Sequence, residues 1–585
     1  MEHPVLTPNG LRVLETRYVR RGEDGHILET PQELFVRVAK TLAYAEVIFG
    51  KSGDESQWND KFLQLLSSLD FLPNSPTLMN AGMPHGQLSA CFVIPVEDSL
   101  AGIFEALKQA ALVQQTGGGT GFSFSNLRPR GDIIKSTGGQ ASGPVSFMKI
   151  FDSATEHIKQ GGKRRGANMG VLRVDHPDIM EFVRAKTHKQ SLQNFNISVG
   201  VTDTFMDAVE KNAAYDLIHP RTQQPVDHIS AKAVFEAIIA SAWETGDPGL
   251  IFLDAINRGN PTPTLGQYEA TNPCGEIPLL PHESCNLGSI NLAHHNLEGS
   301  GVDWEKLRTT VHMAIRFLDN LIEINHYPTE AIEKVSRGNR KIGLGVMGFA
   351  ELLIRLEIPY DSDEAVKFGE RLMKMISQEA RIASANLAKD RGTFPNWAHS
   401  MFKDQNLHVR NATCTAIAPT GTISIIAGTT AGIEPLFALI TKRSHTLGGE
   451  PLYEIAPLLD RYLQKTQFPT TQSPNENQVQ DHLLNHASLP EAVRRVYITA
   501  LEIPPERHLA IQAAFQRHVD NSVSKTINLS EEARPEDVGQ AYWRAWELGL
   551  KGITVFRYGS QGKHVLEVED LYGVPCRSMA QGHSC

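Results

Sequence analysis

Apolar residues recur along this chain with two different periods, and each period predicts a different element. Residues 31–50 carry apolar positions at helical spacing and residues 61–70 continue the pattern, so we expect a mainly helical region over residues 1–85. Residues 305–325 predict an amphipathic helix with one buried face. Short apolar runs with branched and aromatic residues predict buried strands over residues 89–96, 195–201, 413–419 and 551–556.

Predicted strands and helices alternate after the N-terminal region, and this alternation indicates an α/β fold rather than an all-α or all-β one. We expect an α/β body over residues 86–560 and a flexible tail over residues 561–585. The polar run over residues 473–482 predicts a surface loop within the body.

Composition and charge narrow the classes of function. The 585 residues are 41% hydrophobic and 21% charged, as in ordinary soluble proteins. A net charge of −10 gives no general attraction to nucleic acids or anionic membranes. No apolar run is long enough to span a membrane, and the first residues lack the pattern of a secretory signal. We therefore predict a cytoplasmic protein that binds neither nucleic acid nor membrane.

The cysteines are too few for the disulfide framework of a small secreted protein. No two of them form a CxxC pair, so we predict no structural zinc and no metal bound by side chains. In a reducing compartment, thiols that pair are more often catalytic than structural. The six cysteines are Cys91, Cys274, Cys285, Cys414, Cys576 and Cys585.

One cysteine lies between an amide and a carboxylate at two-residue spacing. If the segment were extended, Asn272, Cys274 and Glu276 would share one face, whereas Pro273 and Gly275 suit a tight loop. A neighbouring carboxylate disfavours the thiolate, which argues against a hydrolytic cysteine and favours a neutral thiol that loses a hydrogen atom. The alternative for this motif alone is a structural cysteine in a turn.

The surrounding segments extend this motif. NPCGE (272–276) followed by ESCNLGSINL (283–292) resembles the active-site loop of the ribonucleotide reductases, above all of the adenosylcobalamin-dependent class II enzymes. Other segments that resemble this family, in the family's order, are FLPNSPTLMNAG (71–82), LSACFVIPVEDSL (88–100), TGGGTGFSFSNLRPRGD (116–132), GGKRRGANMGVL (161–172), APTGTISIIAGTTAGIEPLF (418–437) and SVSKTINL (522–529).

The resemblance implies a ten-stranded α/β barrel with a central finger loop that carries Cys274. It also implies reduction of ribonucleoside diphosphates to deoxyribonucleotides, although the sequence leaves diphosphate and triphosphate substrates open. Cys274 would form the thiyl radical that takes the hydrogen atom from C3′ of the ribose, and Glu276 would accept the 3′-hydroxyl proton. Cys91 and Cys285 would supply two electrons and end as a disulfide.

The resemblance also assigns residues that hold the nucleotide and the redox partners. Asn272 would orient the sugar, and Cys576 and Cys585 in the tail would re-reduce the active-site disulfide with electrons from a thioredoxin- or glutaredoxin-like protein. We interpret Cys414 as structural. The substrate contacts implied are Ser75, Thr77, Ala90, Cys91, Gly119, Asn272, Pro273, Cys274, Gly275, Glu276, Pro419, Thr420, Gly421, Thr422, Ile423 and Ser424. The contacts implied for a deoxynucleotide effector, across the interface of a homodimer, are Asp98, Ser99, Arg128, Lys163, Arg164 and Arg165.

The C-terminal region bears on the source of the radical. Tyr542, Tyr558 and Tyr572 are not adjacent to one another, so the tyrosine relay of a class I subunit is missing from this sequence. FRYGSQ (556–561) does not match the glycyl-radical motif R-x-x-G-Y. Adenosylcobalamin is therefore the expected cofactor, although no DxHxxG motif indicates which residues contact it.

Three other functions stay open on the sequence alone. A cysteine-nucleophile hydrolase or transferase would need a thiol of low pKa at Cys274. A nucleotide-binding regulator would keep the loops and show no turnover. A class I large subunit that has lost its tyrosine pair would be active only with a partner subunit.

Overall fold

The computed structural model describes residues 4–84, 86–134, 138–160, 164–187, 191–297, 301–447, 450–455, 459, 491–560 and 567–568. The predicted loop over residues 473–482 lies outside the described residues, as do Lys163, Cys576 and Cys585.

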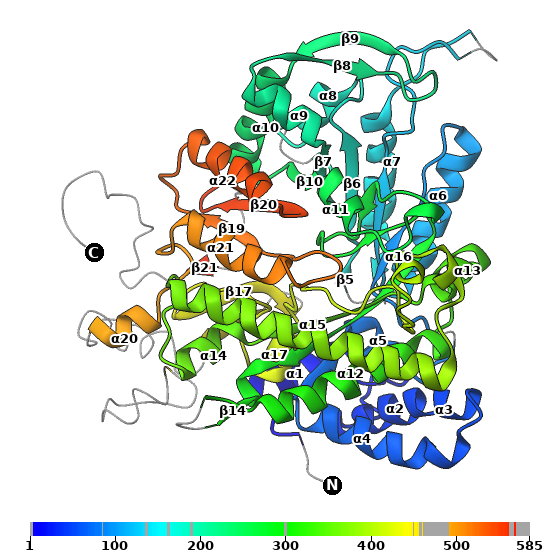
Figure 1. The fold of residues 1–585 in the computed structure, drawn as a ribbon, viewed down its shortest axis with the longest axis vertical. Coiled ribbons are helices and arrows are strands. Elements are labelled where there is room, and N and C mark those ends of the chain that lie inside the picture. Colours follow the sequence, from blue (N-terminus) through cyan, green and yellow to red (C-terminus); the bar gives the residue numbers. More distant parts are fainter. Residues whose placement is uncertain are drawn as a thin grey trace.

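The N-terminal helices form one group at an end of the molecule (Figure 1). They are α1 (Pro8–Arg17), α2 (Pro31–Ala43), α3 (Ala45–Ile48) and α4 (Glu55–Ser67), with the short 3₁₀ helix η1 (Ser52–Asp54). The α2 helix starts in a capping box between Thr30 and Glu33, with a proline in its first turn. Its apolar face packs against α4 and α12 (Trp304–Ile324).

A ten-stranded sheet forms the body of the molecule, and most residues of its central strands are buried. Strands buried on both faces need apolar side chains throughout, which explains the continuous apolar runs in the sequence. The ten strands are β1 (Phe71–Pro73), β2 (Cys91–Val93), β3 (Gly119–Ser123), β6 (Asn168–Arg173), β7 (Phe195–Val201), β10 (Gly249–Phe252), β13 (Glu283–Asn291), β16 (Ile342–Met347), β19 (Thr526–Leu529) and β20 (Gly552–Arg557).

The sheet consists of two parallel halves that meet in antiparallel pairs. Strands β2, β3, β6, β7 and β10 are parallel neighbours, and so are β13 with β16 and β19 with β20. The halves join where β2 pairs with β13 and β10 pairs with β20. Isolated parallel bridges Leu344–Thr415 and Ile417–Val523 continue from β16 towards β19 and close the sheet into a barrel. The predicted α/β barrel is therefore confirmed.

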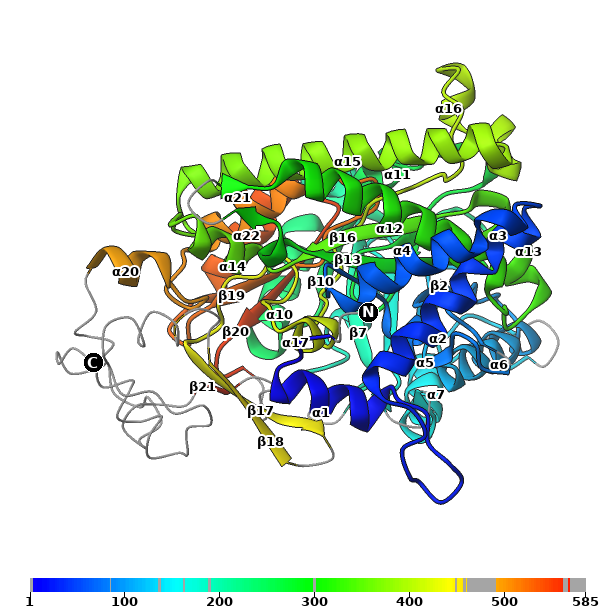
Figure 2. The same ribbon diagram turned by 90° about the horizontal axis from the view of Figure 1, so that it is seen from below.

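Helices cover the outside of the barrel. The longest, α15 (Asp363–Arg391), lies along one edge of the molecule against α12 (Figure 2). The other helices of the described residues are α5 (Ser75–Asn80), α6 (Leu100–Gln115), α7 (Pro144–His157), α8 (Ile179–Val183), α9 (Asp203–Glu210), α10 (Ala231–Thr245), α11 (Leu253–Arg258), α13 (Glu330–Asn339), α14 (Phe349–Arg355), α16 (Met401–Asp404), α17 (Ile423–Ala427), α20 (Glu491–Val496), α21 (Pro505–Gln516) and α22 (Pro535–Glu547), with 3₁₀ helices η2 (Pro263–Leu265), η3 (Leu292–His294) and η4 (Pro395–His399).

Short strands lie outside the main sheet. They are β4 (Lys159–Gln160), β5 (Arg164–Arg165), β8 (Ala214–Ile218), β9 (Pro225–Ser230), β11 (Ala270–Thr271), β12 (Pro278–Leu279), β14 (Asn296–Leu297), β15 (Gly301–Val302), β17 (Ile440–Leu447), β18 (Glu450–Ile455) and β21 (Glu567–Val568). Among the described helices, none combines the length and the apolar character that crossing a membrane requires.

Most predicted elements are present, with shifted ends. The helix predicted over residues 305–325 is α12, and the strand predicted over 195–201 is β7. The strand predicted over 89–96 shrinks to β2, because only Cys91–Val93 pair with both β3 and β13. The run 413–419 is wrong as a continuous strand, since Thr415 and Ile417 make single bridges to different neighbours.

The antiparallel pair β11 and β12 forms a finger hairpin that enters the barrel. Strand β11 contacts β2, β3 and β6. Residues of the hairpin share one buried apolar cluster with side chains from the barrel strands, among them Val93, Val171, Ile251 and Leu287. A hairpin buried in this way presents its tip at a fixed position inside the barrel.

Candidate active site

The tip of the finger hairpin is a tight turn that exposes Cys274. The N–H of Gly275 donates to the Asn272 carbonyl at 3.1 Å, and the N–H of Asn272 donates to the Ile277 carbonyl at 3.2 Å. Gly275 has a φ of +81°, a conformation that side chains disfavour. The segment is thus a turn rather than extended, and its thiol points out while Asn272 and Glu276 are buried.

Glycines of β3 let the hairpin approach the barrel wall. A Cβ on Gly121 would lie 1.7 Å from the Thr271 carbonyl oxygen, and one on Gly119 would lie 2.9 Å from Pro273 Cγ. The Asn196 side-chain amide donates to the Pro273 carbonyl at 2.8 Å. These contacts fix the loop from one side of the barrel.

Cys91 and Cys285 face each other across neighbouring strands, although 194 positions separate them in the sequence. They are Cα partners in the antiparallel pair of β2 with β13, and both are buried. Directly opposite residues of an antiparallel pair lie within the range of Cα separations that a disulfide spans. The Asn272 amide nitrogen lies 3.1 Å from Cys91 Sγ, so the turn and the dithiol are in contact.

Glu276 is a buried carboxyl group with an unsatisfied oxygen. Burial raises its pKa from 4.5 to about 7, although hydrogen bonds from Asn272 and from its own backbone act in the opposite direction. Its Oε2 has no hydrogen-bond partner among the described residues. The backbone carbonyl of Glu276 accepts from the Ser522 N–H at 2.8 Å. A carboxyl group of this kind can accept a proton near neutral pH.

The two buried thiols are held neutral. Burial raises the pKa of Cys91 well above its ordinary value, and Glu276 raises it further. Burial also raises the pKa of Cys285, and Glu283 adds to the rise while Lys341 opposes it. Neutral thiols can give up hydrogen atoms, whereas attack on a carbonyl group needs a thiolate.

Several residues predicted to hold the substrate lie beside this dithiol. Ala90 packs on the cluster that contains both cysteines, and its carbonyl accepts from the Gly119 N–H at 2.8 Å. Ser75 begins α5, and its hydroxyl lies 2.8 Å from the hydroxyl of Tyr18, the residue that follows α1. The side chain of Thr77 is fully buried, and its hydroxyl donates to the Leu88 carbonyl.

The segment from Pro419 to Ser424 follows the closing bridges of the barrel and leads into α17. Thr420 has a φ of +52°, and its hydroxyl accepts from the Gly432 N–H at 2.7 Å. A Cβ on Gly421 would meet no atom within 4 Å, so space is open there. Thr422, Ile423 and Ser424 are buried. Helix α1 packs against α17, and Tyr18, the residue that follows α1, contacts Ser75, so this segment links two parts of the predicted substrate site.

Within one chain, the residues predicted to bind an effector fall into two groups at opposite ends of α6. Asp98 pairs with Arg128 at 2.9 Å, and Ser99 caps the first turn of α6. Arg164 and Arg165 form β5, and the next residue, Gly166, lies against Gln114 in the last turn of α6. A helix of 16 residues is roughly 24 Å long, so one chain does not bring the two groups together.

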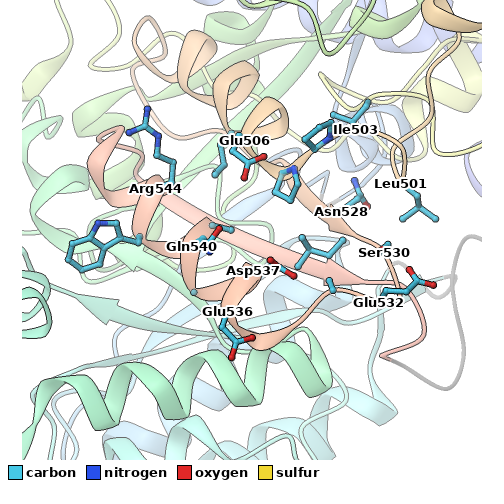
Figure 3. A pocket seen from close by; sticks show the side chains of 18 of the residues that line it. Leu501, Ile503, Glu506, Asn528, Ser530, Glu532, Glu536, Asp537, Gln540 and Arg544 are labelled. Carbon is cyan, nitrogen blue, oxygen red and sulfur yellow. The ribbon is translucent and has the colours of Figure 1, made fainter. Parts of the chain in front are cut away.

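A cavity of about 910 Å³ lies elsewhere, between α21, α22 and β19 (Figure 3). Glu506, Asp537 and Arg544 line it. None of the predicted site residues that the structure describes lines it, so it is separate from the cysteine site. Among the described residues, no group of three or more histidines, cysteines or carboxylates is arranged to hold a metal ion.

Sequence reasoning missed the residues that hold the site in place. Asn196 lies in a strand without a motif, and Ser522 begins the segment SVSKTINL, but no local signal in either segment indicates its contact with the finger loop. The buried group of Lys341, Glu283 and Tyr268 was also missed, because its members are far apart in the sequence.

Comparison with known proteins identifies the family. Residues 89–556 match the model "Ribonucleotide reductase, barrel domain", and residues 5–86 match "Ribonucleotide reductase, all-alpha domain". The chain is 48% identical to the "Vitamin B12-dependent ribonucleoside-diphosphate reductase" of Thermoplasma acidophilum, over 96% of this chain and 80% of that protein. It is 50% identical to the protein of the same name from Mycobacterium tuberculosis, over 98% of this chain and 80% of that protein.

The fold agrees with a solved structure. The Actinobacillus ureae class Id ribonucleotide reductase alpha subunit superposes with a TM-score of 0.77 at 24% identity, covering 96% of this chain and 99% of that one. The finger hairpin inside a ten-stranded barrel, the cross-strand cysteines and the two family matches lead to one assignment: the chain belongs to the ribonucleotide reductases.

Proposed function

We propose that this chain reduces ribonucleoside diphosphates to 2′-deoxyribonucleotides by thiyl-radical chemistry, with adenosylcobalamin as the radical source. The observation that carries the proposal is the arrangement of one exposed thiol, Cys274, at the tip of a buried hairpin beside the dithiol Cys91–Cys285. The names of the two relatives at about half identity support both the diphosphate substrate and the vitamin B12 cofactor.

The residues at the tip of the hairpin fit such a cofactor. Cys274 is the exposed thiol of the site, and a Cβ added to Gly275 or Gly421 would meet no atom within 4 Å. The Cys274 thiol and the backbone at Gly275 and Gly421 are therefore open to a bound group. The chemistry that adenosylcobalamin supplies when bound is one-electron chemistry, by homolysis of a cobalt–carbon bond.

The chain's own residues divide the remaining work. Cys274 Sγ, after losing its hydrogen atom, takes a hydrogen atom from C3′ of the ribose and returns it at the end. Glu276 accepts the 3′-hydroxyl proton as the 2′-hydroxyl leaves as water, and its unpaired Oε2 is available for that contact. Cys91 and Cys285 lose two hydrogen atoms and form a disulfide. The balance is one ribonucleotide and two thiols giving one deoxyribonucleotide, one disulfide and one water.

The nucleotide lies, in this proposal, across the turn 419–424 and the start of α5. Backbone N–H groups and hydroxyls of Thr420, Gly421, Thr422 and Ser424 face the phosphates, and Ser75 adds a hydroxyl. Asn272 and the backbone around Ala90 and Gly119 hold the sugar. This places the ribose between the exposed Cys274 and the buried dithiol.

Regulation and re-reduction complete the proposal. A deoxynucleotide effector binds between the two copies of a homodimer. The two groups of effector residues lie at opposite ends of α6 within one chain, so a second copy can supply the group that the first copy holds too far away. Asp98, Ser99 and Arg128 form one part, and Lys163 to Arg165 the other. Cys576 and Cys585 pass electrons from a thioredoxin- or glutaredoxin-like protein to the active-site disulfide.

The test is anaerobic turnover by this chain alone with dithiothreitol and an effector, with and without adenosylcobalamin. We expect deoxynucleotide only with the cofactor, loss of product in Cys274→Ala, and product retained in Cys414→Ala. Cys414 is the matched control, because it is equally a cysteine but lies buried in a different apolar cluster. Turnover without the cofactor, or activity in Cys274→Ala, would overturn the proposal.

Measurements of alkylation and of nucleotide binding on the same protein separate the rival functions. Rapid alkylation of Cys274 at neutral pH without nucleotide reduction would indicate a hydrolase or transferase. Nucleotide binding without any product would indicate a regulator or a subunit that needs a partner.

A further inference from the structure

A buried lysine lies beside the dithiol without a part in the chemistry above. The Lys341 ammonium donates to Glu283 Oε2 at 2.7 Å and to the Tyr268 hydroxyl at 2.6 Å, and the side chains of Lys341 and Glu283 are fully buried. The ammonium also lies 4.3 Å from the centre of the Tyr268 ring. A charge is expensive to bury, so an ion pair inside a barrel needs an explanation beyond stability.

The strand register places Lys341 next to Cys285. Strands β13 and β16 are parallel, with Asn286 opposite Ile342 and Leu287 opposite Gly343. Lys341 is the residue before β16, so the same register continued one step back brings it beside Cys285, whose pKa it lowers. Residues opposite each other in a sheet project on the same face.

That shared face is the interior of the barrel. A Cβ on Gly343 would lie 2.5 Å from the Leu287 side chain and 3.3 Å from Ile277 of the finger hairpin, so this face looks towards the hairpin. Lys341 lies two residues before Gly343, and Cys285 lies two residues before Leu287. Side chains two residues apart in a strand project on the same face, so Lys341 and Cys285 also face the hairpin. Tyr268 and Cys285 also belong to one buried cluster.

The two sulfurs of the dithiol therefore have different electrostatic surroundings. Cys285 has the Lys341 ammonium beside it, and the effect of this cation on the thiol is larger than the opposing effect of Glu283. The groups with the largest effects on Cys91 are Glu276 and the other two thiols, and all of them disfavour a negative charge. The described hydrogen bonds of Lys341 use two of its three N–H donors, which leaves one for a neighbouring anion.

We propose that Lys341 is a positioning residue that gives the Cys91–Cys285 disulfide a fixed polarity, so that Cys285 is the sulfur that leaves as thiolate during re-reduction. The inference rests on the proposed function, since it concerns the disulfide that turnover produces. Glu283 and Tyr268 hold the ammonium in place, and the negative charge of Glu283 weakens the effect of the ammonium on Cys285.

The step balances with an external dithiol as the reductant. Its first thiolate attacks Cys91 Sγ, the disulfide bond breaks, and the electron pair moves to Cys285 Sγ, which then takes a proton. The second thiol of the reductant, as thiolate, displaces Cys91, which also takes a proton. The protein ends as the dithiol and the reductant as a disulfide.

The experiment needs no turnover, so it stands apart from the test of the proposed function. The full-length protein is oxidised with diamide, reduced with dithiothreitol, and quenched with iodoacetamide at intervals, and peptide mapping follows Cys91 and Cys285. With a monothiol in place of dithiothreitol, the same mapping shows which cysteine carries the mixed disulfide. The variants are Lys341→Met, Lys341→Arg and Glu283→Gln.

We expect the reduction to slow about tenfold in Lys341→Met, because removing the cation raises the pKa of the Cys285 thiol and a leaving thiol of higher pKa departs more slowly. Glu283→Gln should act in the opposite direction and speed the reduction, and Lys341→Arg should restore most of the rate. In the wild type, the mixed disulfide should lie on Cys91 and the alkyl group on Cys285.

A merely structural lysine would not give effects of opposite sign. If Lys341→Met and Glu283→Gln change the rate in the same direction, or if the mixed disulfide lies equally on both cysteines, the proposal is wrong. If Lys341→Met does not fold, the double variant Lys341→Met with Glu283→Gln takes its place, because it leaves no unpaired charge. A wild-type rate of reduction in this double variant, with the mixed disulfide still on Cys91, would also refute the proposal. Lys186→Met, which breaks the ion pair with Asp247 at 2.7 Å, is the matched control and should reduce at the wild-type rate.

Discussion

Replacing Glu276 by Gln should make the protein more stable and far less active. Burial raises the pKa of this carboxyl group from 4.5 to about 7. Between these values the folded protein keeps a proton that the unfolded chain has lost, so this group's contribution to stability falls as the pH rises from about 4.5 to about 7. At about 1.4 kcal/mol per pKa unit, the ionised group costs the fold about 3 kcal/mol above pH 7.

The neutral Gln side chain removes that cost. For a chain of this length, about 3 kcal/mol corresponds to a rise of about 3 °C in the unfolding temperature. We therefore expect Glu276→Gln to unfold about 3 °C above the wild type at pH 8. The difference should close towards pH 4.5, where both side chains are neutral.

Activity should change in the opposite direction. Loss of a general base costs about a hundredfold to ten-thousandfold in kcat. The wild-type rate should rise with pH through about 7, because only the ionised carboxylate can accept the proton.

The assay is calorimetry of the substrate-free proteins at pH 8 and pH 4.5, together with single-turnover reduction across that range. Glu23→Gln, at an exposed position, is the control and should show no such difference. Equal unfolding temperatures for wild type and Glu276→Gln at pH 8 would show that the carboxyl group bears no burial cost. Undiminished activity in Glu276→Gln would show that it is not the base.

Three further substitutions test how the site is held. Gly121→Ala should abolish turnover and lower stability, because its Cβ would lie 1.7 Å from the Thr271 carbonyl oxygen. The control is Gly53→Ala, whose Cβ would meet no atom within 4 Å and which should change neither property. Calorimetry and turnover measure both variants. Asn196→Ala should lower kcat more than it raises KM, since it removes the hydrogen bond to the Pro273 carbonyl, and equal effects on both would count against this role. Cys91→Ser should stop multiple turnover and disulfide formation while peptide mapping still finds Cys285 as a thiol.

The sequence determined the chemistry and the main elements of the fold. The spacing of Asn272, Cys274 and Glu276 indicated a neutral thiol beside an acid, and the structure places all three at one turn. The helical period over residues 305–325 predicted α12, and the apolar run at 195–201 predicted β7. Local patterns of this kind predict elements correctly because their period shows directly which face of the element is buried.

The tertiary structure decided which distant residues meet. Cys91 and Cys285 pair only because β2 and β13 run antiparallel in one register, and a pattern within either strand carries no information on that pairing. The raised pKa of Glu276 follows from burial inside the barrel, and Lys341 reaches Cys285 through the register of β16. Strand pairing, burial and electrostatic surroundings are properties of the assembled barrel, so they appear only when its segments come together.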